Sequence, residues 1–210
     1  MVNLIAFSLL FLTPASQACD ALMLSTDFSA VDQLSEASLV VLLVAGVVDP
    51  AKVIKDSQDF VNKYYGNESK MDMDDADEYI ENLEAALELE SDKITPAQKL
   101  SVLLNLSKVN NLVFKKKGKL MGMGYGKRSF AYLKKAVKLD PKSPEAARVY
   151  GEGVAGMVEA HSQGAIEFAI GVSLKDEANA AIKLLEDNGL KASQSYKTIQ
   201  LELPKLKAKK

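Results

Sequence analysis

A glycine-rich, basic stretch, KGKLMGMGYGKRS at residues 117–129, is the first candidate for chemistry because such loops can hold phosphates. A P-loop needs two glycines separated by four residues and then Lys followed by Ser or Thr, so that backbone amides surround the phosphates. Here the residue five before Gly126 is Met121, and Arg128 follows Lys127. The spacing of a dinucleotide-binding loop is also missing. The stretch therefore predicts no nucleotide cofactor.

The same stretch also has a spacing that favours helix packing. Gly118, Gly122 and Gly126 recur at every fourth residue, which on a helix makes one stripe without side chains. Such a stripe lets a neighbouring backbone pack closely. A loop between helices is the alternative, since each glycine costs a helix about 1 kcal/mol relative to alanine. The sequence leaves both interpretations open.

Residues for metal binding and catalysis are scarce, because His and Cys each occur once in 210 residues. We interpret the single histidine, His161, as a surface or packing residue rather than a general base. The acidic run at 70–79 fails as a calcium loop. Ala76, Asp77 and Leu83 stand where that loop needs an acid or amide, a glycine and a glutamate. We therefore expect no metal, no cofactor and no enzymatic activity.

The elements that would position any site are predicted to be helical. Apolar residues recur at helical spacing, and no long alternation of apolar and polar residues predicts a strand. Asp49-Pro50, Thr95-Pro96 and Asp140-Pro141 are helix stop or start signals. The pattern predicts an all-α chain, with helices near 28–48, 51–65, 74–90, 96–117, 127–139, 143–160, 163–172, 175–187 and 193–203.

The N-terminal segment, residues 1–18, is uncharged and apolar and is typical of a signal peptide. Ser16 and Ala18 are the small residues that signal peptidase prefers, so cleavage would leave Cys19 first. Cys19 would then be either lipid-modified, as in bacterial lipoproteins, or unmodified. We expect an exported protein of the periplasm or cell envelope, with an N-terminal core helix as the alternative.

The stretch SFAYLKKAVKLDPKSPEAARVYG, residues 129–151, resembles the tetratricopeptide repeat. Ala136 and Gly151 are small where two helices would cross, and Pro141 would end the first helix. The residues that carry the resemblance are Leu133, Ala136, Leu139, Asp140, Pro141, Ala146, Tyr150 and Gly151. A weaker echo at 83–89 lacks the proline.

The resemblance implies antiparallel helical hairpins stacked as a short, degenerate tetratricopeptide-like solenoid. A non-repetitive bundle is the alternative. We expect a helical-repeat domain over 19–190, followed by a C-terminal helix and basic tail over 191–210. Through residues 125–128, the chain is also similar to the periplasmic helical-repeat component of tripartite ATP-independent transporters.

These resemblances imply a scaffold that binds another protein. The alternative is an accessory protein that binds a small or lipid-like ligand for a transporter. We expect partner contacts on the polar faces of 96–117 and 143–160, with Lys108, Asn110, Asn111 and Arg148 as candidate contact residues.

Charge is divided unevenly along the chain. Residues 20–94 carry 18 acids and 5 bases, whereas 95–210 carry 10 acids and 21 bases. The basic half is expected to attract an acidic protein partner, the acidic half of the same protein through self-association, or an anionic membrane or cell-wall polymer. A lipid on Cys19 would be a separate route to the membrane. Export and a sequence pI of about 5.6 argue against nucleic acid as a binding partner.

Overall fold

The computed structural model describes residues 49–160 and 163–207, all of which belong to one unit of the chain. The expected signal peptide, Cys19, the helix predicted at 28–48 and His161 lie outside these residues. Every regular element that the structure describes is helical, which confirms the predicted all-α class. The elements are α4 (Pro50–Tyr64), η2 (Glu68–Lys70), α5 (Met73–Leu87), α6 (Pro96–Met121), α7 (Met123–Leu139), α8 (Pro144–Glu159), α9 (Gln163–Ile170), α10 (Leu174–Asp187), α11 (Gln194–Glu202) and η3 (Leu203–Lys205).

Local capping explains where these helices begin. In α4, α5, α6, α8, α10 and α11, the side chain of the N-cap residue accepts a hydrogen bond from a backbone N–H of the first turn, which satisfies one of the free donors at a helix start. Thr95 does this reciprocally with Gln98 in a capping box at the start of α6. The other capping residues are Asp49, Asp72, Ser143, Ser173 and Ser193.

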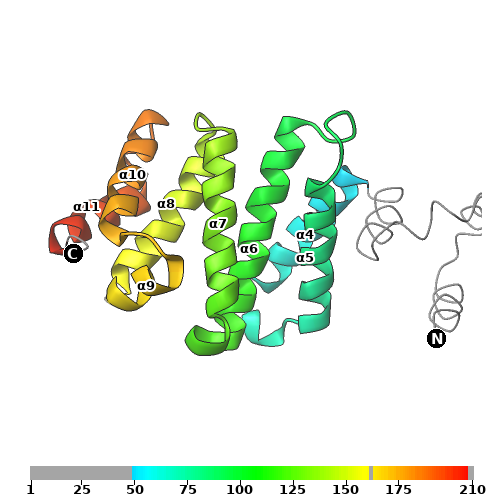
Figure 1. The fold of residues 1–210 in the computed structure, drawn as a ribbon, viewed down its shortest axis with the longest axis horizontal. Coiled ribbons are helices and arrows are strands. Elements are labelled where there is room, and N and C mark those ends of the chain that lie inside the picture. The colour runs from blue at the N-terminus through cyan, green and yellow to red at the C-terminus, as the bar shows by residue number, and fades with distance from the viewer. Residues whose placement is uncertain (1–48, 161–162, 208–210) are drawn as a thin grey trace, which may run out of the picture. The chain divides into compact units, whose positions relative to one another are not determined.

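The helices pack as hairpins. α5 packs on α4, α7 on α6 and α10 on α8, and Figure 1 shows α6 and α7 side by side along their length. The first helices of the hairpins also contact one another, because α6 packs on α4 and α8 packs on α6. Helix α11 packs on α8 as well. None of the described helices is long and apolar enough to span a lipid bilayer.

Two apolar cores hold this arrangement, and α6 contributes to both. One core joins α4, α5 and α6, and Val102 and Leu106 of α6 belong to it. The other core joins α7, α8, α10 and α11, and α6 contributes Leu103 and Leu104 to it. Burial of this apolar surface is the main stabilising contribution, and α6 is therefore the element that fixes α4 relative to α8.

The residues of the repeat motif lie at the α7–α8 turn and in the second core. Leu133, Ala136, Ala146 and Tyr150 are buried together. Gly151 is buried against Leu185 of α10. Helix α7 ends at Leu139, which is 43% exposed rather than packed, and Asp140 is its C-cap. Pro141 follows in an exposed turn.

The glycines of the 117–129 stretch do not form one helical stripe, so that interpretation is wrong. Gly118 has a φ of 75° and a ψ of 176°, which interrupts the helix, and Gly122 separates α6 from α7. The two later glycines nevertheless meet one residue closely. A Cβ on Gly122 would lie 2.7 Å from Phe114 O, and one on Gly126 would lie 3.1 Å from the Phe114 ring. The stretch is therefore the tight end of a hairpin.

Candidate functional site

A surface cleft of about 260 Å³ lies between α4, α6 and α8. We call it the α4–α6–α8 cleft. Most of the side chains that line it are polar or charged. The full set of lining residues is Ile54, Lys55, Gln58 and Asp59 from α4, Ser101, Leu104 and Asn105 from α6, and Glu145 from α8.

Helical spacing places these residues on one face. Gln58 follows Ile54 by one turn on α4, and Asn105 follows Ser101 by one turn on α6, so each pair projects from the same side of its helix. Glu145 lies in the first turn of α8, which the Ser143 cap fixes. The positions at which the helices begin therefore determine which side chains face the cleft.

Asn105 links the floor of the cleft to α4. Its Nδ2 donates to Ile54 O at 3.0 Å and to Ser57 Oγ at 2.9 Å. The Ser57 hydroxyl donates in turn to Ile54 O at 2.9 Å. Asn105 is 2% exposed, so these bonds form in a setting where an unpaired amide would be costly. Both amide hydrogens are engaged, and the side chain is held in one orientation.

Lys108 does not line the cleft but pairs with Glu145, which does. Its Nζ lies 3.4 Å from Glu145 Oε1, an ion pair that joins α6 to α8. Arg148, on the same helix as Glu145, pairs with Glu152 at 2.6 Å. These partly exposed pairs add little stability, but each one compensates a positive charge that was expected to attract an acidic partner.

The two neighbouring asparagines of α6 differ in position. Asn111 is exposed. Asn110 is fully buried, its Nδ2 donates to Leu106 O at 2.8 Å, and its Oδ1 has no hydrogen-bond partner among the described residues. The expectation that Asn110 contacts a partner is wrong, because a residue with no exposed surface cannot reach one.

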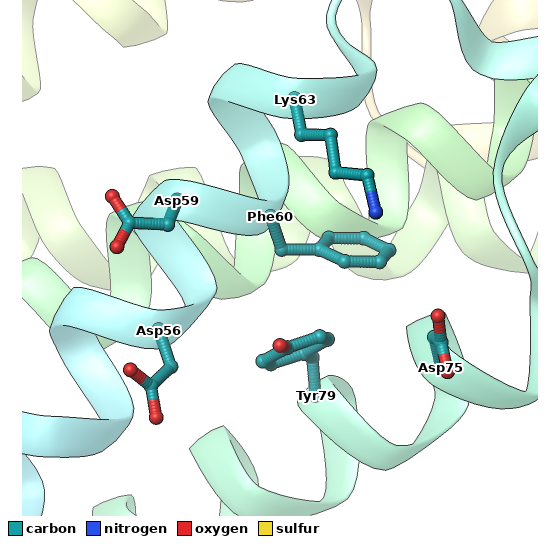
Figure 2. A pocket seen from close by; sticks show the side chains of 6 residues that line it. All are labelled: Asp56, Asp59, Phe60, Lys63, Asp75 and Tyr79. Atoms are coloured by element: carbon teal, nitrogen blue, oxygen red, sulfur yellow. The ribbon is translucent and has the colours of Figure 1, made fainter.

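A second crevice, of about 220 Å³, lies between α4 and α5. Figure 2 shows the rings of Phe60 and Tyr79 facing each other, with the carboxylates of Asp56 and Asp75 on opposite sides of Tyr79 in this view. The two ring centroids are 4.5 Å apart. Burial, and then the charges of Asp56 and Asp75, raise the pKa of Tyr79. Asp59 lines both this crevice and the α4–α6–α8 cleft.

The chemistry available at these surfaces is hydrogen bonding and charge pairing. Among the acidic residues that line the two openings, Asp59 pairs with Lys55 and Glu145 pairs with Lys108. Asp56 and Asp75 make no ion pair with the described residues. Across residues 49–160 and 163–207, no group of three or more His, Cys, Asp or Glu side chains is placed to hold a metal ion.

None of the lining residues was among the contact residues expected from the sequence. The cleft forms where helices about fifty residues apart meet, and no local pattern records that contact. Asn105 carried one usable signal, because it interrupts the short apolar run VLLNL at residues 102–106, where a polar residue needs buried partners. No protein-family model, curated protein or solved structure matches this chain.

Proposed function

We propose that this chain is an exported, tetratricopeptide-like scaffold of the cell envelope that binds a segment of a partner protein in the α4–α6–α8 cleft. One observation carries the proposal. Three helices from successive hairpins supply side chains to a single open, hydrophilic cleft. Such a surface suits an extended peptide with polar side chains better than a lipid-like ligand, whose pockets are enclosed and apolar. The protein binds its partner rather than transforming a substrate.

The partner segment is expected to be basic. Lys108 and Arg148 already pair with Glu145 and Glu152, so they offer little uncompensated charge to an acidic partner. Asp59 lines both openings but pairs with Lys55 at 3.1 Å, whereas Asp56 and Asp75 of the neighbouring crevice make no ion pair with the described residues. These two carboxylates supply the uncompensated negative charge. Complementary charge steers association and sets specificity more than it sets affinity, and here it favours Lys or Arg side chains.

The cleft is preorganised for such a segment. The hydrogen bonds of Asn105 hold α4 at a fixed position on α6, and the Lys108–Glu145 pair joins α6 to α8. A peptide would therefore enter a site whose walls need little rearrangement, and this lowers the entropic cost of binding.

An array of short peptides of graded net charge, probed with the full chain, tests this function. Basic peptides should be retained, and the Asp56→Asn/Asp75→Asn variant, which removes the two lining carboxylates without an ion-pair partner among the described residues, should lose them. The matched variant Glu81→Gln/Asp92→Asn removes two exposed carboxylates outside both openings and should bind as the natural chain does. Equal retention of acidic and basic peptides, or equal binding by both variants, would overturn the proposal.

A further inference from the structure

The tip of the α6–α7 hairpin exposes an apolar patch. Leu120 is 88% exposed, Met121 82% and Met123 37%. Single exposed apolar residues are ordinary on protein surfaces, but here three lie within four consecutive positions at the end of one hairpin. These side chains belong to neither core. The patch therefore needs an explanation other than folding stability.

The backbone holds the tip in a defined conformation. Gly118, with its φ of 75°, ends the regular part of α6 before the tip. The Gly122 N–H then donates to Gly118 O at 2.8 Å, and the Gly126 N–H donates to Gly122 O at 3.0 Å. Gly122 leaves no room for a Cβ beside Phe114 and Gly118. The apolar side chains thus project from a tightly packed turn.

Basic side chains flank the tip on both arms of the hairpin. Lys127 is exposed and makes no hydrogen bond or ion pair with the described residues. Lys117 Nζ and the Arg128 guanidinium lie 4.7 Å and 4.4 Å from the centre of the Tyr125 ring. Lys116, on the same arm as Lys117, donates to the backbone oxygens of Ser69 and Met71.

The neighbouring acids compensate only part of this charge. Glu68 pairs with Lys115 at 3.2 Å, and Asp77 accepts a hydrogen bond from the Tyr125 hydroxyl at 3.2 Å. Lys115 also lies 5.0 Å from the ring centre of Tyr65, which is 69% exposed. The hairpin end therefore combines exposed apolar side chains, two tyrosines and cations on both arms.

We infer that this tip is a membrane-contact site that inserts Leu120, Met121 and Met123 into the interface of an anionic lipid bilayer. Peripheral membrane elements bury apolar side chains just below the headgroups and place Lys and Arg against anionic lipids. Tyrosines suit the headgroup level because their rings are apolar and their hydroxyls are polar. The site is separate from the α4–α6–α8 cleft and does not depend on what that cleft binds.

Charge favours a membrane over a protein as the occupant. The cores of protein interfaces are depleted in lysine, whereas here cations lie on both arms behind the apolar patch. Long lysine and arginine side chains can extend along an apolar surface and still reach charged headgroups. An anionic bilayer matches both features at once.

A local fluorescent reporter tests this inference on the full chain. The sequence contains no tryptophan, so Met121→Trp introduces a single one at the tip. Its emission should shift to shorter wavelength with vesicles of phosphatidylcholine containing about 30% phosphatidylglycerol, and brominated lipids should quench it. Leu201→Trp, at an exposed position on α11, should show neither change. Because the reporter is local, binding of the apolar N-terminal segment cannot imitate the result.

Vesicle sedimentation supplies the energetic test. Leu120→Asn/Met121→Asn should weaken binding to the anionic vesicles at least tenfold, whereas Leu201→Asn should leave it unchanged. Lys127→Gln and Arg128→Gln should each weaken binding about fivefold, and Lys142→Gln/Lys197→Gln should have no effect. Unchanged binding of the tip variants, or a Met121→Trp shift that occurs without lipid and grows with protein concentration, would overturn the inference. The second result would assign the tip to self-association.

Discussion

The hydroxyl of Tyr150 on α8 donates a hydrogen bond to the buried carboxylate of Glu177 on α10. Lys134 Nζ on α7 lies 2.6 Å from the same carboxylate. Three helices of the second core thus meet at one buried charge. Removing a partner from such a charge is destabilising, because the carboxylate then stays buried with fewer hydrogen-bond donors.

Tyr150→Phe is therefore expected to lower the free energy of unfolding by about 1.5–3 kcal/mol. Tyr132→Phe is the matched control. The Tyr132 hydroxyl donates to Glu84 at 2.6 Å, but both of these side chains are only half-buried, so the expected loss is about 1 kcal/mol. Urea unfolding of both variants measures the difference. A loss in Tyr132→Phe as large as that in Tyr150→Phe would contradict this account of the buried charge.

The same tyrosine predicts a loss of stability at alkaline pH. Burial, and then Glu177, raise the pKa of Tyr150 well above its ordinary value of 10.0. Above about pH 10 the unfolded chain releases this proton while the folded chain keeps it, so the free energy of unfolding falls by up to about 1.4 kcal/mol per pH unit. Urea unfolding from about pH 9 to 11 should give a shallower decline in Tyr150→Phe than in the natural chain. Parallel declines would show that Tyr150 is not the group responsible.

Much of the fold could be predicted from the sequence because its signals are local. Asp49, Thr95 and Ser143 are caps that can be recognised from a few residues, and the observed helices begin close to the predicted positions. Gly118 shows the limit of that approach. A four-residue spacing of glycines is compatible with a continuous helix, and only the fold reveals the positive φ that breaks it.

The candidate site was harder to predict because it depends on which face of each helix is covered. Asn110 and Asn111 are adjacent, yet one is buried and the other exposed. The spacing contained this information, since Leu103, Leu106 and Val113 are buried and share the helical face of Asn110. The contact between α4 and α6 had no comparable signal.

The contact between Gly151 and Leu185 should behave as a tight helix crossing. A Cβ on Gly151 would lie 2.9 Å from Leu185 Cδ1, so Gly151→Ala is expected to cost about 1–3 kcal/mol. Leu185→Val should recover part of that loss in the double variant. Gly156→Ala, on the same helix with open space around it, should be neutral or stabilising by up to about 1 kcal/mol. Additive losses in the double-mutant cycle would exclude the crossing as the cause.

The end of the α6–α7 hairpin offers a second matched pair of glycines. A Cβ on Gly122 would lie 2.7 Å from two backbone oxygens, which cannot move without opening the turn. Gly122→Ala should therefore lower the thermal midpoint by several degrees, in line with a loss of about 1–3 kcal/mol. Gly124→Ala meets nothing within 4 Å and should match or exceed the natural midpoint. A lower midpoint for Gly124→Ala than for Gly122→Ala would be inconsistent with the turn described above.

The central claim is that a partner segment occupies the α4–α6–α8 cleft. Titration calorimetry with a basic peptide selected from the array measures this directly for two variants. Ser101→Tyr places a ring in the cleft, and Ala131→Tyr places the same ring on an exposed site of α7 outside it. If the cleft is the site, Ser101→Tyr should weaken binding at least tenfold, about 1.4 kcal/mol, while Ala131→Tyr retains the natural affinity. Equal affinities in the two variants, with both still folded, would place the partner elsewhere and contradict the claim.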